Sequence, residues 1–258
     1  MDLRQIGKDL DLYLHLQSFP VAVRMITSAE DIPKKARMPK RDLETPMAVC
    51  QGIALARRSG WLMAMSREDM ACPLGALTLG FVPARDKFLN GSISVYPWLK
   101  NQGARAKMAQ ALPRLEPGKY NHILIAPVHR ADFEAHLIIV YGNPAQIARL
   151  IQAAIYGTGT PMNSQSFGGF ACGEEITKTI LSDECQFILT GGGDRVFAQT
   201  HDREVVFAMP VSKVNAIVEG LEETEKAGLR YPTPAFLTFV GAFPPTFVKL
   251  MEYLKQGD

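Results

Sequence analysis

Apolar residues in this chain occur in short runs, and these runs alternate with segments whose apolar residues follow the spacing of a helix. The runs HILIAPV (122–128) and HLIIVYG (136–142) have the length of β-strands. The second run leads into Asn143-Pro144, a strong helix start, and an apolar stripe follows it. No window reaches the roughly 18 uncharged apolar residues of a membrane span. The pattern predicts an α+β, or mixed α/β, protein without a membrane partner.

The charge balance narrows the classes of function. The 258 residues include 28 Lys+Arg and 26 Asp+Glu, so the formal net charge is +2 and a dedicated nucleic-acid binder is not expected. The first 17 residues carry charges where a signal peptide needs an apolar core, which predicts a cytoplasmic protein. Cytosolic thiols are usually kept reduced, so the four cysteines need an explanation other than disulfides.

The order of the expected elements repeats along the chain. Both parts read as a strand, a helix, a glycine stop, an extended segment, a helix led by a cysteine, a strand and a helix. The separation of Gly60 from Cys72 nearly equals that of Gly159 from Cys172. This order favours an internal duplication, although little residue identity supports the alignment.

The repeat also predicts how the chain is divided. Residues 1–233 are expected to form a single compact domain of two pseudo-repeats, about 15–118 and 119–230, which share one core. Residues 92–98 (SISVYPW) are expected to be a strand of the first half.

Residues 234–258 form an apolar C-terminal extension, in which Pro245 starts a terminal helix. Its large side chains are too numerous to stay exposed on a monomer: Phe236, Phe239, Phe243, Phe247, Leu250 and Leu254. They either pack on the protein's own core or form a subunit interface. Homo-oligomers are common, and we favour a homodimer.

Three cysteines are expected at helix N-termini. Cys50 lies near the first turn of a helix, Cys72 directly precedes Pro73, and Cys172 directly precedes Gly173. The positive end of a helix dipole favours the thiolate, which is both a nucleophile and a metal ligand. If the two halves pack about a pseudo-twofold axis, Cys72 and Cys172 become equivalent and face a shared centre. That arrangement suits a thiolate-bound metal or an iron–sulfur cluster.

The alternative for these cysteines is structural. Free cysteine is often buried and behaves as a small hydrophobe, and the chain has no CxxC pair. Cys185 leads a strand instead of a helix, so we expect it to be part of the core. A thiol-nucleophile enzyme is a weaker reading, because no histidine partner is evident.

Two glycine-rich stretches are further candidates. In SFGGFACGEE (166–175), Gly168, Gly169 and Gly173 lie beside a helix N-terminus, where they could cradle an anionic group. TGGGDR (190–195) is expected to be a hairpin turn between two strands. Neither stretch matches a dinucleotide or P-loop motif.

Several blocks of the sequence resemble a prokaryotic family catalogued as domain of unknown function 169, across about residues 15–233. They include PVAVRMI, VCQGIALAR, ACPLGALTLGF, YGNPAQIARLIQAAIY, FACGEEI and GGGDRVFA. The resemblance implies that the cysteines at 50, 72 and 172 recur in similar sequences. It also implies a further cysteine just before the GDR triplet in many relatives, where this chain has Gly191-Gly192. At most three matching ligands remain, unless Cys185 substitutes for the fourth.

Two functional hypotheses follow. The first is a cysteine-ligated cofactor protein that binds a metal or an iron–sulfur cluster, such as a redox accessory protein of anaerobic metabolism. The second is a binding module for a small anionic ligand, with Gly168, Gly169 and Gly173 at the site and the cysteines structural. The sequence does not decide whether the protein is an enzyme.

Overall fold

The structure of the chain is a computed structural model, which describes residues 2–233 and 244–255. Six strands form one antiparallel sheet in the order β2-β3-β1-β4-β6-β5. The strands are β1 (Val21–Ile26), β2 (Met63–Ser66), β3 (His122–Pro127), β4 (Leu137–Gly142), β5 (Gln186–Leu189) and β6 (Val205–Pro210). The α+β class predicted from the sequence is therefore confirmed.

The described residues form eleven α-helices and four further helical segments of other types. The α-helices are α1 (Leu3–Leu14), α2 (Pro39–Leu43), α3 (Val49–Ser59), α4 (Pro73–Thr78), α5 (Asp86–Leu89), α6 (Gln102–Ala111), α7 (Pro144–Ile155), α8 (Thr179–Ser182), α9 (Gly192–Ala198), α10 (Val211–Lys226) and α11 (Pro245–Lys255). The further segments are the 3-10 helices η1 (Ala29–Asp31), η2 (Arg67–Asp69) and η3 (Val128–Arg130) and the π-helix η4 (Gly173–Lys178). No helix within these ranges is long and apolar enough to cross a membrane.

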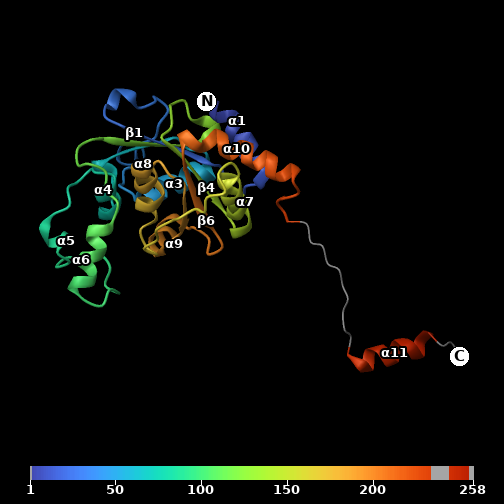
Figure 1. Cartoon of the computed structure of the whole chain (residues 1–258). Helices are drawn as coiled ribbons and strands as arrows, with labels where there is room; N and C mark the ends of the chain where they lie inside the picture. Colours follow the sequence, from blue (N-terminus) through green and yellow to red (C-terminus); the bar gives the residue numbers. More distant parts are fainter. Residues whose placement is uncertain (1, 234–243, 256–258) are drawn as a thin grey trace.

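Helices cover both faces of the sheet, because the central strands are apolar on both sides. On one face, Val23 and Ile125 pack with Ile53 of α3 and with residues of η4. On the other, α1, α7 and α10 pack against β4 and β6, with Leu10 among the buried residues. Figure 1 shows the sheet between these two groups of helices. The hydrophobic core is thus divided by the sheet into two layers.

The boundaries of several elements follow from local signals in the sequence. The Asn143 side chain accepts from the backbone N–H groups of Ala145 and Gln146, both at 3.0 Å, so α7 begins where predicted. Gly60 ends α3 with a φ of 72°, a left-handed conformation that glycine adopts without strain. The predicted strands at β1, β3, β4 and β6 are all present.

The strand order is symmetric about the pair β1-β4 at its centre. Outward from this centre the order is β1, β3, β2 on one side and β4, β6, β5 on the other, so β1, β2 and β3 correspond to β4, β5 and β6. This symmetry is the arrangement that an internal duplication produces, and the duplication itself stays a prediction. β3 pairs with both β1 and β2. In the symmetric arrangement the two halves therefore meet between β3 and β4, not before β3 as the sequence alignment places the boundary.

Two predicted elements are wrong. Residues 92–98 form turns and bends in place of a strand: Ser94 Oγ accepts from the Tyr96 N–H at 3.0 Å, and the side chain of Ile93 is exposed. The expected glycine hairpin turn is the start of α9, because the carboxylate of Asp194 accepts from the Gly191 N–H at 3.1 Å. A side chain that bonds to the nearby backbone decides the local structure in both places.

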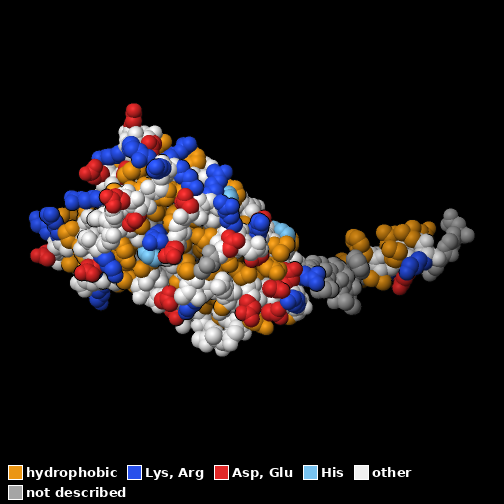
Figure 2. All heavy atoms as spheres, turned by 90° about the horizontal axis from the view of Figure 1, so that it is seen from above, with side chains coloured by type: hydrophobic (Ala, Val, Ile, Leu, Met, Phe, Trp, Pro, Cys, Tyr) orange, Lys and Arg blue, Asp and Glu red, His pale blue; other side chains and the backbone are white. Residues whose placement is uncertain are grey.

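The predicted terminal helix is present as α11, and its apolar side chains are exposed, among them Phe247, Leu250 and Leu254. In Figure 2, hydrophobic side chains gather on the part of the chain that follows the grey residues. The other aromatic residues predicted to contribute, Phe236, Phe239 and Phe243, lie outside the described residues.

The packing of α7 against α10 gives a first prediction. A Cβ added at Gly220 of α10 would lie 2.3 Å from the carbonyl oxygen of Ala153 in α7. We expect Gly220→Ala to lower the free energy of unfolding by about 1–3 kcal/mol, although alanine is the better helix former. Urea unfolding followed by circular dichroism measures the difference.

The matched control is Gly103→Ala in α6, where an added Cβ would meet only Asn101 Oδ1 at 3.4 Å. This variant should be as stable as the natural chain, or more stable by up to about 1 kcal/mol. Equal stabilities of the two variants would show that α7 and α10 are not in the close contact described.

Candidate functional site

Three of the four cysteines line a single pocket of about 440 Å³. Cys50 lies in the first turn of α3, Cys72 is the residue before α4, and Cys172 is the residue before η4. Gly168 and Gly169 line the same pocket, together with the start of α9 and the aromatic residues Tyr96, Trp98, Phe170 and Phe197. The sequence therefore identified residues from separate segments that the fold brings together.

Backbone contacts bring Cys50 and Cys72 to the same place. The Met47 N–H donates to the Asp69 carbonyl oxygen at 2.8 Å, and the Ala71 N–H donates to the Met47 carbonyl oxygen at 3.0 Å. The residues that precede α3 and α4 thus run side by side. Cys50 also packs in a small apolar cluster with Ala198 of α9 and with Cys72.

Cys172 is held near them by a contact between α4 and η4. The Thr177 hydroxyl donates to the Thr78 carbonyl oxygen at 3.1 Å, and the Thr78 hydroxyl lies 2.9 Å from Thr177 Oγ1. Both threonines are buried. This contact ties the helix that follows Cys72 to the helix that follows Cys172.

The two glycine-rich stretches meet at this pocket. A Cβ at Gly191 would lie 2.5 Å from Gly169 Cα, so the two backbones touch and Gly191 has no room for a side chain at that contact. At Gly192 an added Cβ would meet nothing within 4 Å. Gly173 does not line the pocket. A Cβ at this position would lie 2.0 Å from the Phe170 ring, so the absence of a side chain at Gly173 allows Phe170 to pack there.

The pKa values of two pocket cysteines are shifted in the direction opposite to the sequence-based prediction, which was that helix dipoles favour thiolates. Burial raises the pKa of the Cys172 thiol well above its usual value, and Asp194 and the other two thiols raise it further. Burial, followed by Asp194 and Glu175, also raises the pKa of Cys50. Desolvation and neighbouring negative charge outweigh the dipoles of these helices. Without a bound cation, Cys50 and Cys172 are protonated thiols.

Three buried carboxyl groups stand around the pocket. Burial raises the pKa of Glu174 to about 7 and that of Glu175 to about 8, and it also raises the pKa of Asp194. The Tyr141 hydroxyl lies 3.2 Å from Glu175 Oε2 and donates to it. Glu174 Oε2 and Glu175 Oε1 have no hydrogen-bond partner among the described residues. The surroundings of the thiols are therefore rich in groups that carry either a proton or a negative charge.

The same pocket contains an unused hydrogen-bond donor. The Tyr96 side chain is buried, and its hydroxyl has no partner within the described part of the chain. Among the described residues that line the pocket there is no Lys, Arg or His. Nor do the described residues include a group of three His, Cys, Asp or Glu side chains arranged to hold a metal ion. The cysteines share a pocket without surrounding one common point.

Cys185 is excluded from this site. It lies directly before β5 and packs in the core layer formed with α1, α7 and α10. Cys172 packs against the layer on the opposite face of the sheet. Cys185 therefore does not replace a fourth cysteine of the pocket, and its predicted role as a core residue is confirmed.

The symmetric strand order also changes which cysteines correspond. α3 lies between β1 and β2 as η4 lies between β4 and β5, so a duplication with this strand order pairs Cys50 with Cys172. α4 follows β2 as α9 follows β5, so Cys72 corresponds to the start of α9 at Gly191-Gly192. This pairing differs from the predicted equivalence of Cys72 with Cys172, and both pairings depend on a duplication that stays a prediction. Sequence reasoning also missed Tyr96 and Asp194, which become part of the site only through the fold.

Comparison with known proteins extends these observations. The DUF169 family, described as uncharacterised ArCR, matches residues 9–220. An uncharacterised protein of Methanocaldococcus jannaschii is 27% identical over 225 residues, which cover 86% of this chain and 94% of that protein. No solved structure matches the chain significantly. The range matched by the family includes all three pocket cysteines and ends before α11.

The raised pKa of Glu175 predicts how stability depends on pH. In the folded protein this pKa is about 8, against a usual value of 4.5, so between these values the folded state holds a proton that the unfolded state has lost. The free energy of unfolding should therefore fall as pH rises from about 5 to 8. We expect Glu175→Gln to reduce this slope, as measured by urea unfolding of chelator-treated protein at several pH values.

Glu116→Gln, which changes an exposed glutamate, is the control and should retain the slope of the natural chain. If Glu175→Gln retains that slope as well, the carboxyl of Glu175 does not hold a proton in the folded protein.

Proposed function

We propose that the chain, which belongs to the DUF169 family, binds a thiolate-ligated metal cofactor in the pocket of Cys50, Cys72 and Cys172. The observation that carries this proposal is the convergence of three thiols from separate segments on one pocket, whose described lining residues include the carboxyl group of Asp194 and no basic side chain. An iron–sulfur cluster is the cofactor that fits best. The corresponding role is that of a redox accessory protein.

The electrostatics of the pocket support a cation. A thiophilic cation that binds to thiols with raised pKa values displaces their protons. It can do so because the metal stabilises the thiolates that burial disfavours. The carboxyl group of Asp194 adds further negative potential. Soft thiolate ligands select iron–sulfur clusters, zinc or copper(I).

The volume of the pocket suits a cluster. Thiolates that bind one zinc ion must all lie about 2.3 Å from the same point. No such arrangement of three side chains occurs among the described residues. In a 4Fe–4S cluster each thiolate binds a different iron, so the sulfurs lie further apart, and the pocket of about 440 Å³ leaves room for several atoms.

The side chains around the thiols suit such a group. The unpartnered Tyr96 hydroxyl can donate a hydrogen bond to a sulfur of the cofactor, which is one way in which a protein adjusts a cluster's reduction potential. The backbones of Gly168 and Gly169 allow close approach from the opposite wall. Val95, Trp98 and Phe197 form an exposed apolar rim that limits the access of water.

The two alternative functions have less support. An anionic ligand at Gly168 and Gly169 would face Asp194 and would meet no basic side chain among the described lining residues. A thiol nucleophile needs a lowered pKa or a neighbouring base. The raised pKa values of Cys50 and Cys172 and the absence of His from the described lining residues oppose that role.

The proposal predicts metal in the protein. Chain purified without oxygen should contain iron or another thiophilic metal in stoichiometric amount, with thiolate-to-iron absorption in the visible range if it is a cluster. Cys72→Ser and Cys172→Ser should each lose most of this metal. Elemental analysis together with absorption spectra measures both effects.

Cys185→Ala is the control, because it removes a cysteine from the other face of the sheet, and it should retain the metal. Gly192→Cys adds a thiol where an extra Cβ meets nothing within 4 Å, and it should increase metal retention. Anaerobically purified protein without stoichiometric metal would overturn the proposal.

We also propose that the chain is a cytoplasmic homodimer in which the exposed apolar side chains of α11 contribute to the interface. Deleting residues 234–258 should then halve the solution mass measured by light scattering. The circular dichroism spectrum is the control, since residues 2–233 contain the complete sheet and should stay folded. An unchanged mass would show that the extension does not mediate assembly.

A further inference from the structure

Two hollows meet at the N-terminal helix, away from the cysteine pocket. They have volumes of about 340 Å³ and 770 Å³, and Arg4 and His129 line both, so together they form one groove. Among the described residues, the groove and the cysteine pocket have no lining residue in common.

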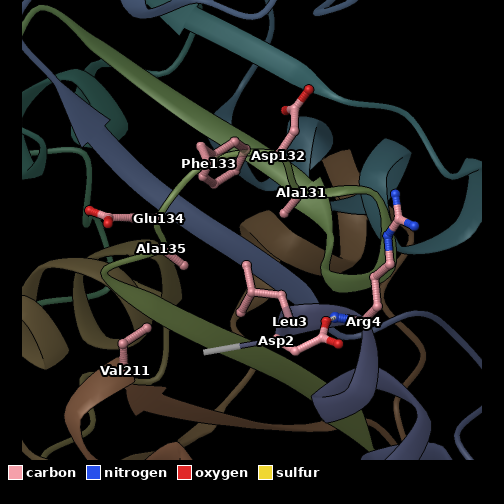
Figure 3. Close-up of a pocket in the computed structure, with 9 residues that line it drawn as sticks. All are labelled: Asp2, Leu3, Arg4, Ala131, Asp132, Phe133, Glu134, Ala135 and Val211. Carbon is pink, nitrogen blue, oxygen red and sulfur yellow. Dashed lines mark hydrogen bonds between the residues drawn. The ribbon is translucent and has the colours of Figure 1, made fainter.

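The smaller hollow is strongly cationic. Arg4, Lys35, Arg37 and Arg130 line it, with Asp132 as its one acidic residue in the described ranges. Figure 3 shows the Arg4 side chain extending from α1 beside the loop that carries Asp132. The chain as a whole has a net charge of only +2, so this concentration of positive charge is local.

Most of these positive charges are not neutralised by the protein. Lys35 pairs with Asp132 at 3.0 Å. Within the described residues, no carboxylate lies within 4.0 Å of the guanidinium groups of Arg4, Arg37 and Arg130. Burial lowers the pKa of His129, and the charges of Arg130 and Arg4 lower it further. An anion in the hollow would thus find three unpaired guanidinium groups.

Two of these arginines are fixed in place. Arg37 is held at the edge of β2, where its N–H donates to the Leu62 carbonyl oxygen at 2.8 Å, and its guanidinium lies 3.8 Å from the centre of the Trp61 ring. Arg130 Nη1 donates to the Gly60 carbonyl oxygen at 2.7 Å. Arginines held in this way lose little side-chain entropy when they bind a ligand.

The larger hollow adds an apolar wall to the groove. Leu16, Phe19, Pro20 and Val128 contribute to it, and Phe19 is 42% exposed. The same hollow is also lined by charged residues, namely Lys8, Asp11, Arg57 and Arg58. The Phe19 ring meets the edge of the His129 ring, with 4.6 Å between ring centres. The groove therefore joins, at His129, a cationic end to an end that has an aromatic and apolar wall among further charged residues.

We propose that this groove binds a nucleotide, with its phosphates at Arg4, Arg37 and Arg130 and its base against Phe19. Guanidinium groups bind phosphate through paired hydrogen bonds, and aromatic rings stack on bases. The two hollows have the dimensions of small-molecule sites. This site is independent of the proposed cofactor pocket.

Isothermal titration of the full-length protein with ATP, pyrophosphate and adenosine at low ionic strength tests the proposal. ATP should bind with one-to-one stoichiometry, and more tightly than pyrophosphate or adenosine. Arg4→Ala should weaken ATP binding about tenfold, because it removes a charged hydrogen-bond donor. Phe19→Ala should weaken the binding of ATP but not that of pyrophosphate.

Arg85→Ala is the control, since it removes an exposed arginine outside the groove, and it should bind ATP as the natural chain does. Arg4 is exposed and its side chain makes no hydrogen bond to the described residues, so Arg4→Ala should fold normally. ATP binding that is absent, or that Arg4→Ala leaves unchanged, would overturn the proposal. Equal affinity for pyrophosphate and ATP would also overturn it, as would binding restricted to long oligonucleotides.

Discussion

β1 and β4 pair at the centre of the sheet, and this contact joins two three-stranded parts of the chain. Three pairs of residues form it: Val21 with Ile139, Ala22 with Ile138, and Val23 with Leu137. Because side chains alternate along a strand, a shift of one residue would exchange the two apolar faces. The helices α3 and η4 could then no longer pack on the same side. The convergence of Cys50 and Cys172 depends on this register.

Much of this fold can be predicted from the sequence because its signals are local. The apolar runs that became β3 and β4 and the Asn143-Pro144 helix start all act over a few residues. The strand predicted at 92–98 and the hairpin predicted at Gly191–Gly193 failed for a local reason too, because Ser94 and Asp194 bond to the backbone next to them. Apolar periodicity contains no information about these bonds.

The candidate site illustrates a different limit. The three pocket cysteines were recognisable by residue type and by their place at helix starts. Their protonation was not, since it depends on burial and on Asp194 and Glu175, which come from other segments. Tyr96 is part of the pocket although it lies in a segment without regular structure, and no sequence pattern marks it. The helix dipole near a residue can be predicted from the sequence, whereas the desolvation of its side chain depends on the folded structure.

The three pocket cysteines belong to segments that are distant along the chain, at positions 50, 72 and 172. Any group that bonds to all three would act as a covalent branch point and would close two large loops. Such a branch point restricts the unfolded chain more than the folded one, as a disulfide does, and the restriction grows with loop length. The segments before α3, α4 and η4 would be joined even in the denatured protein. Loss of the bound group would then change the chemistry of the pocket, and it would also change the ensemble of unfolded conformations from which the sheet forms.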